Sequence, residues 1–160
     1  MKEFRSAAGF AAHLTRLIPA AVLAEERGLD SAAAIIEREA KQEIGHYQRD
    51  NTGPFAQWAE LADRTKEQRL DLGFTENDPG YRTGEMRDSI SRTVRLNEAV
   101  VGSNDDHLVW FELGTSKQPP RSALGLAAYR KAGQAASLVG SHVSWAIAGL
   151  APRNSQENQV

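Results

Sequence analysis

The chain has 160 residues, carries 19 Lys+Arg against 21 Asp+Glu for a formal net charge of -2, and contains no cysteine. A chain of this length can bury roughly 70% of the surface that its unfolded form exposes, so a self-sufficient core is expected. The lack of a basic excess argues against general binding to nucleic-acid phosphates, and the lack of cysteine excludes disulfides, thiolate zinc sites and cysteine nucleophiles.

Helical spacing of apolar residues predicts two helices in the first 50 residues. The first is expected over about 5–27, with a kink at Pro19, because proline has no N–H to donate. Gly28 is expected to end it, and Asp30 or Ser31 to cap the second. The apolar stripe of the first helix consists of Phe10, Leu14, Leu17, Ile18 and Ala21, and the buried face of the second of Ala33, Ile36, Ala40, Ile44 and Tyr47.

The run LIPAAVLA at 17–24 follows Lys2 and Arg5 and so resembles a secretory signal. Polar residues interrupt the approach to the run, and its eight residues are far fewer than the ~20 that span a bilayer. We therefore expect neither a signal peptide nor a membrane segment.

The central part of the chain alternates short elements with loops. Pro54 suits the first position of a third helix, with Phe55, Trp58, Leu61 and Ala62 as its apolar patch. The segment 73–84 is dense in turn formers, with 77–80 as the expected tight turn. Beyond it, Thr83 is expected to cap one turn of helix.

Two β-type runs at 90–96 and 99–103 predict a hairpin around 97–98, with Ile90, Val94 and Leu96 on one face. The segment 108–113 fits either a strand or a helix. We favour a helix, because Asp105 and Asp106 suit the positive N-terminal end of a helix and Gly114 is a residue at which a helix often stops. Two prolines prevent 114–120 from continuing a helix or strand, so we expect this segment to be a loop that projects at the surface. A last helix follows over about 122–150, with one side formed by Leu124, Ala128, Ala135, Leu138, His142 and Trp145.

These elements predict an α+β fold in which a small antiparallel sheet packs against helices. We expect one domain over 1–150, comprising a helical part over 1–50, a motif-bearing part over 54–121 and a C-terminal helix over 122–150. The polar residues 151–160 are expected to form a disordered tail.

Catalytic motifs are incomplete in this sequence. The segment EIGH at 43–46 has the spacing of a di-iron ligand pair but no second copy, and GTSKQ at 114–118 lacks the second glycine of a nucleophile elbow. One cluster could hold a metal or work as an acid and base, which leaves a small metal-dependent hydrolase as an alternative function: Asp105, Asp106, His107 and Glu112. A further alternative is a nucleic-acid adaptor whose basic residues are interleaved with acidic ones: Arg64, Lys66, Arg69, Arg82 and Arg87.

Three segments in order resemble the tail-completion or neck family of tailed phages, also described as head-tail joining or virion-morphogenesis proteins. They are WAELADRTKEQ at 58–68, YRTGEMRDSI at 81–90 and AVVGSNDDHLVWFELGTSKQPPR at 99–121. The family shows a Trp-Leu-Thr-Lys stretch, then Thr-Gly-x-Leu with Ser-Ile, then Val-Gly-Ser, Glu-Phe-Gly-Thr and Pro-x-Arg. The match spans about 58–129. Met86 and Leu113 depart from it, and the first 50 residues have no counterpart.

The resemblance implies a structural virion protein without catalytic activity, cofactor or metal. It implies a homo-oligomeric ring, a hexamer, at the neck or tail end, formed in the host cytoplasm before assembly. Its partners would be a neighbouring stopper or adaptor protein and a tail terminator or tail tube protein. Double-stranded DNA would pass through the lumen without specific binding, and no membrane would be involved.

The residues expected to serve assembly fall into four groups. Trp58 and Trp110 are predicted to anchor the core, and Thr83 and Gly84 to shape a helix start. Glu112 and Arg121 are predicted to form an ion pair at the base of the loop. The loop itself contributes Gly114, Thr115, Ser116, Lys117, Gln118 and Pro119.

Overall fold

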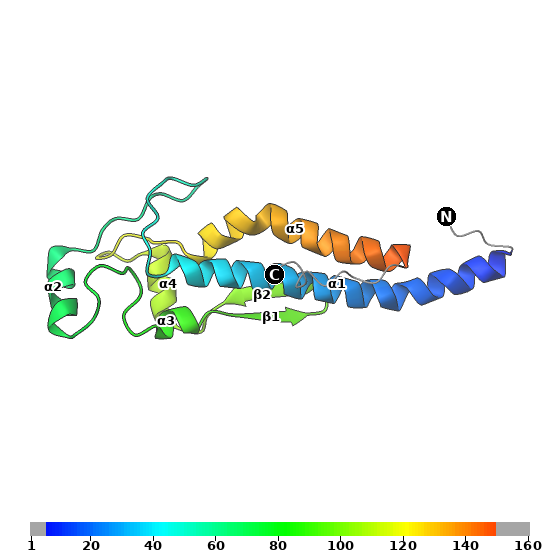
Figure 1. The fold of residues 1–160 in the computed structure, drawn as a ribbon, viewed down its shortest axis with the longest axis horizontal. Coiled ribbons are helices and arrows are strands. Elements are labelled where there is room, and N and C mark those ends of the chain that lie inside the picture. Colours follow the sequence, from blue (N-terminus) through cyan, green and yellow to red (C-terminus); the bar gives the residue numbers. More distant parts are fainter. Residues whose placement is uncertain (1–5, 150–160) are drawn as a thin grey trace, which may run out of the picture.

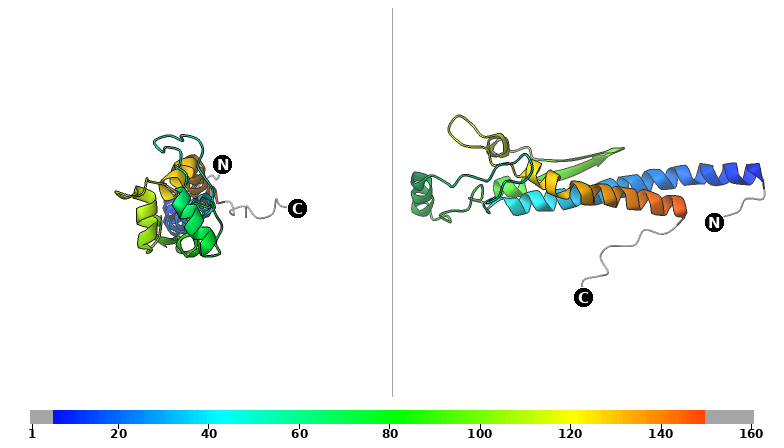
Figure 2. Two further views of the ribbon diagram at one scale, coloured as in Figure 1. Left: turned by 90° about the vertical axis from the view of Figure 1, so that its left-hand side faces the viewer. Right: turned by 90° about the horizontal axis from the view of Figure 1, so that it is seen from above.

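The protein is elongated: two long helices lie side by side, a hairpin runs along them, and short helices gather at one end (Figures 1 and 2). This computed structural model describes residues 6–149, so the expected tail at 151–160 lies outside the described residues. Helices α1 (Ala7–Glu43) and α5 (Leu124–Ala148) form the antiparallel pair. The remaining helices, α2 (Asp63–Asp71), α3 (Glu85–Asp88) and α4 (Asp106–Leu113), form what we call the compact end, together with their loops. The α+β class is confirmed.

Helix α1 replaces the two helices predicted for the N-terminal region. Ser6 caps it by accepting a hydrogen bond from the backbone N–H of Gly9 at 3.1 Å. The helix then continues through Pro19 and Gly28 to Glu43. The predicted end at Gly28 is wrong because this glycine serves packing: a Cβ built there would lie 2.9 Å from Cα of Val139 on α5. Glycine at this position lets the two helix backbones approach closely.

The helix predicted to begin at Pro54 is also wrong. Pro54 lies in a turn closed by two backbone hydrogen bonds between Thr52 and Phe55, of 2.9 and 3.1 Å. The chain then runs without regular structure past Trp58. The backbone N–H of Trp58 donates to the carbonyl of Gln48 at 2.8 Å. Helix α2 begins only at Asp63, so the apolar residues before it pack as a loop and do not form a helix face.

The hairpin is confirmed with a small shift. Strands β1 (Ser91–Arg95) and β2 (Glu98–Gly102) pair antiparallel, from Ser91 opposite Gly102 to Arg95 opposite Glu98. Leu96 lies in the turn with φ of 48° and is 89% exposed, so it does not share a face with Ile90 as predicted.

The hairpin is tied to α1 through one arginine. Arg92 donates to Asp30 at 2.8 Å and to Glu37 at 2.7 Å, both on α1. These contacts hold the sheet against the long helix.

Helix α4 settles the ambiguous segment in favour of a helix. Asp105 caps it by accepting from the N–H of His107 at 2.9 Å. Gly114 ends it with φ of 74° and ψ of 179°, a positive φ but not the left-handed helical conformation.

Helix α5 runs without a break past its three internal glycines. The predicted face of α5 is partly wrong, since Ala128 is exposed while Leu126 and Ala127 are buried.

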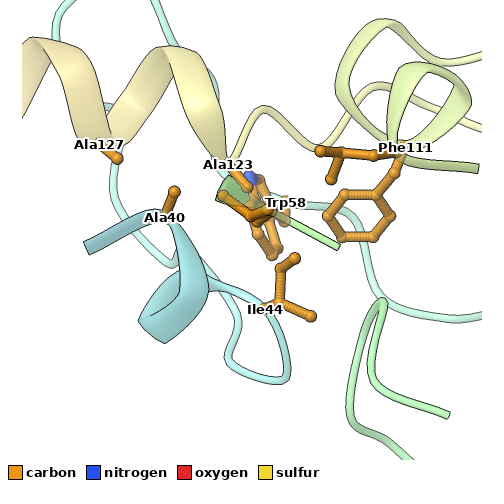
Figure 3. Close-up of a cluster of buried hydrophobic side chains, with 8 residues drawn as sticks. Ala40, Ile44, Trp58, Phe111, Ala123 and Ala127 are labelled. Carbon is orange, nitrogen blue, oxygen red and sulfur yellow. The ribbon is translucent and has the colours of Figure 1, made fainter. Parts of the chain in front are cut away.

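The core lies where the compact end meets the two long helices. Trp58 and Phe111 meet edge to face there, with ring centroids 5.3 Å apart, which is a favourable aromatic geometry (Figure 3). The buried cluster consists of Ala40, Ile44, Trp58, Ile90, Leu108, Phe111, Ala123 and Ala127.

The first half of α1 contributes nothing to this core and is largely exposed. One window of α1 is apolar enough to cross a membrane by length and composition, and none of that window is buried. The same composition occurs in core helices of soluble proteins and in signal sequences, so it does not by itself identify a membrane segment.

Candidate assembly site

The compact end contains a groove of ≈ 670 Å³ between α2, α3 and α4, which we call the compact-end groove. Several predicted site residues line it: Thr83, Gly84, Trp110, Gln118 and Arg121. Its apolar surface includes Leu72 and Trp110, which are 54% and 50% exposed. The groove thus combines exposed apolar side chains with a polar rim, the composition of a protein-binding surface.

Glu112 does not face the groove but caps helix α5. Its carboxylate accepts from the backbone N–H groups of Ala123, Leu124 and Gly125 at 2.7, 2.9 and 2.8 Å. It also accepts from the hydroxyl of Ser122. Helix α5 has no side-chain cap of its own, so this carboxylate from α4 satisfies N–H groups that would otherwise lack a partner at the positive end of the helix.

Arg121 holds the segment that follows Trp58. It is 4% exposed, and its Nη2 donates to the carbonyls of Ala59 at 2.7 Å and Glu60 at 3.2 Å. Burial lowers the pKa of its guanidinium below the usual range. No ion pair joins Arg121 to Glu112 among the described residues, so the predicted pair is wrong. Each of the two side chains instead binds backbone groups of another segment.

Together, Glu112 and Arg121 fix both ends of the segment Gly114–Pro120, which we call the GT loop. At its first residue, a Cβ on Gly114 would lie 2.7 Å from N of Pro120 and 2.8 Å from the carbonyl of Gln118. This crowding and the positive φ restrict the position to glycine. At its end, the N–H of Arg121 donates to the carbonyl of Phe111 at 2.7 Å.

The tip of the GT loop is both ordered and exposed. Thr115 and Gln118 exchange backbone hydrogen bonds of 2.8 and 3.3 Å. The N–H of Lys117 donates to the hydroxyl of Thr115 at 3.2 Å. Ser116, Lys117 and Pro119 are exposed, and the loop projects from the body beside α4 (Figure 2). The loop therefore presents polar side chains on a fixed backbone.

The two predicted tryptophan anchors differ. Trp58 is 5% exposed and lies in the core as predicted, whereas Trp110 is half exposed, so its anchoring role is wrong. The rings of Trp110 and His107 meet in a T-shaped contact, with centroids 5.1 Å apart, and the neighbouring Phe111 takes the buried position. Phe111 is buried in place of Trp110 because consecutive residues of a helix point about 100° apart, so only one of the two can face the core.

The start of α3 is shaped by Gly84, which occupies the N-cap position with φ of 93°. Thr83 lies one residue earlier and is not the N-cap. Its hydroxyl donates to the carboxylate of Glu85 at 3.0 Å and accepts from the N–H of the same residue at 3.4 Å.

Arg69 has a structural role, although it was one of the basic residues considered for nucleic-acid binding. It is 7% exposed and donates to the carbonyls of Thr75 at 2.6 Å and Tyr81 at 2.5 Å, which fixes the loop between α2 and α3. Of the other basic residues in that set, Lys66 pairs with Glu60 at 3.2 Å and Arg87 with Asp88 at 2.9 Å. Burial and ion pairs thus occupy these three side chains.

The acidic cluster proposed for a hydrolase is not brought together. Asp105 and His107 lie at the start of α4 and bond to each other at 2.8 Å, whereas Glu112 lies at the other end and caps α5. Within residues 6–149, no group of three or more His, Asp or Glu side chains could hold a metal ion. Hydrogen bonds from His107 lower the pKa of Asp105 below its usual value.

Comparisons with protein-family models, with curated proteins and with solved structures found no match to this chain.

Proposed function

We propose that the protein is a structural subunit of a tailed phage or phage-like particle. It forms a homo-oligomeric ring, a hexamer, at the neck or tail end and joins the DNA-filled head to the tail. The order of motifs over residues 58–129 supports this assignment. The role needs a stiff body and projecting contact segments, and it needs no reacting group.

The observation that carries the proposal is the construction of the GT loop. Its two ends are fixed by Glu112 and Arg121, its backbone is closed on itself, and its tip is exposed. A loop ordered before contact loses little conformational entropy when it binds a neighbouring protein. Such a loop suits repeated docking between virion parts.

The compact-end groove is the second contact surface in this proposal. The GT loop contributes Gln118 to its lining, and α4 contributes Trp110. A stopper or adaptor protein on one side and a tail terminator or tube protein on the other would bind the loop and the groove. Exposed tryptophan is a preferred anchor residue in such interfaces.

The charge of the chain fits a conduit that does not hold DNA. The formal net charge is -2, and basic residues such as Lys66 and Arg87 are paired with carboxylates. Passage of double-stranded DNA requires a lumen without a basic surface that would retain phosphates.

Complementation of particle assembly tests the proposal. A variant with Ser116→Asp and Lys117→Asp changes only exposed side chains and leaves the Thr115–Gln118 hydrogen bonds in place. We expect a folded ring that fails to join heads to tails, seen as separate heads and tails by electron microscopy. A control with Ser137→Asp on the exposed side of α5 should assemble normally. Normal yields of joined particles with the loop variant, or absence of the wild-type chain from purified particles, would contradict the proposal.

A further inference from the structure

The face of α1 that packs against α5 continues beyond the end of α5. Ala24 and Gly28 lie on the packed part of this face, and α5 ends at Ala148. A mostly apolar cavity of ≈ 310 Å³ marks where the pairing stops, and its lining includes Ala20, Leu23 and Arg27 of α1 and His142 and Ala146 of α5. From there α1 continues to Ala7, and no other helix or strand of the described residues lies beside it (Figures 1 and 2).

The spacing of apolar residues shows that the packing face is the same on both parts of α1. Steps of four and three residues alternate from the exposed part into the packed part, as in the seam of a coiled coil, through Phe10, Leu14, Leu17, Ala21, Ala24 and Gly28. Beside this seam, Ile18 and Val22 form a second strip, 66% and 55% exposed. Leu14 on the seam is 44% exposed. We call residues 14, 17, 18, 21 and 22 the α1 stripe.

The spacing of the seam favours an apolar helix of similar length as the partner of the α1 stripe. Among the described residues, no helix lies against the stripe beyond the end of α5 (Figures 1 and 2). We therefore look for this partner in another molecule.

A bilayer fits the α1 stripe less well than a second helix does. Spanning lipid requires about 20 residues that are apolar on all sides, because every side chain then faces hydrocarbon. In this segment Thr15 and Arg16 interrupt the apolar surface on the face away from the seam, and Arg16 would lie near the membrane centre at a high cost. A one-sided stripe with coiled-coil spacing indicates a helical partner.

We propose that the α1 stripe binds the same segment of a second copy of this chain, with the two helices parallel. The parallel orientation rests on the proposed ring, because the rotation that relates neighbouring copies in a six-membered ring does not reverse the direction of equivalent helices. The seam and the second strip lie about 100° apart, as neighbours such as Leu17 and Ile18 do on any helix. Each copy therefore offers its seam to one neighbour and its second strip to the other.

The size of this contact agrees with a closed assembly rather than a lone pair. Residues 7–23 form a helix segment about 25 Å long, and pairing two such segments buries on the order of 1,000 Å². Stable interfaces bury about 1,600 Å², so a single pair is weak. In a closed ring every copy makes this contact twice, and the copies hold one another together.

Cysteine cross-linking of the full-length protein tests the contact, because the natural chain has no cysteine. The double variant Leu17→Cys/Ile18→Cys places one thiol on each strip. Under mild oxidation we expect a ladder of covalent species that extends beyond the dimer. The matched control Ala12→Cys/Arg16→Cys carries both thiols on the opposite face and should remain largely single chains. A double variant that cross-links no more than the control would overturn the proposal.

Mass measurement by light scattering gives an independent readout. Wild type should have a multiple of the 17.5 kDa chain mass, and Ile18→Glu should shift it towards one chain while circular dichroism shows unchanged helix content. Arg16→Glu is the control and should keep the wild-type mass. A wild-type mass of one chain would contradict the inference, as would flotation with phosphatidylcholine vesicles that Ile18→Glu abolishes.

These results separate the inference from the proposed function. An oligomer that survives Ile18→Glu would overturn the stripe contact and leave a ring held by other surfaces. Stripe-dependent oligomers of a chain that is absent from particles would keep the contact and overturn the virion role.

Discussion

Replacing Glu112 by alanine removes the only side-chain cap that helix α5 has within the described residues. Three backbone N–H groups and the hydroxyl of Ser122 lose their acceptor, at the helix end where a negative charge is favourable. Loss of a cap costs about 0.5–2 kcal/mol, and loss of a hydrogen bond to a charged group about 1.5–3 kcal/mol. Water can reach part of this half-buried site, so we expect a loss of roughly 3 kcal/mol in the free energy of unfolding.

Thermal and urea unfolding of Glu112→Ala measure this loss. For a chain of 160 residues, a change of about 3 kcal/mol corresponds to a decrease in Tm of roughly 6–12 °C. Glu112→Gln keeps one acceptor oxygen, so its Tm should lie between those of the wild type and Glu112→Ala. Glu67→Ala, on the exposed side of α2, should change stability by less than about 0.5 kcal/mol. A value for Glu112→Ala within that range of wild type would refute the capping role and with it the fixed base of the GT loop.

Three further changes test other parts of the fold. Gly114→Val adds a strained φ and a clash with the GT loop backbone, so it should destabilise the chain by roughly 3 kcal/mol or more in urea unfolding. Gly28→Leu places a side chain against the α5 backbone and should cost about 1–3 kcal/mol in the same assay. Hydrogen bonds from Lys41, which has the larger effect, and from Arg92 lower the pKa of Glu37. Glu37→Gln should therefore destabilise the folded chain at neutral pH. Because the folded pKa is the lower one, this difference is fully present above the ordinary value of 4.5 and disappears as the pH falls through the folded pKa, as Tm against pH should show.

Matched controls isolate each cause. Gly73→Val has the same strained φ, of 77°, with open space around it, so it should cost clearly less than Gly114→Val. Gly133→Ala lies in a helix with nothing within 4 Å and should stabilise by up to about 1 kcal/mol, in contrast to Gly28→Leu. A stability difference for Glu37→Gln that persists at pH 2 would contradict the ionic cause.

Local patterns predicted the elements whose signals lie within a few residues. The hairpin at 91–102 follows from alternation, and helix α4 from Asp105 and Asp106 at its positive end and Gly114 after its last residue. Both depend on contacts between near neighbours in the sequence. The fold class followed from these elements together with the long helical segments.

Tertiary contacts explain the wrong predictions. Gly28 followed by Asp30 has the sequence of a helix end and a new start, but close packing against Val139 gives the glycine a different role. Pro54 suits a helix start, yet it lies in a turn between Thr52 and Phe55, and the backbone N–H of Trp58 donates to the carbonyl of Gln48. Neither partner can be inferred from local sequence.

The sequence identified the residues of the candidate site but not the contacts that they make. The GT loop, Glu112 and Arg121 were identified as one unit, and the structure places them together. Proximity along the chain suggested an ion pair, whereas both side chains bind backbone groups. Arg69 gave no signal, because a buried arginine that bonds two carbonyls has the same local sequence as an exposed one.

The unbroken course of α1 has a mechanical consequence. Its 37 residues span about 55 Å, with the α1 stripe near one end and the core residues Ala40 and Ile44 near the other. A rod of this length that tilts by about 5° moves its far end by about 5 Å. If the proposed ring forms, a change in the tilt of α1 at the stripe would shift the compact end and its GT loop without any refolding of the subunit.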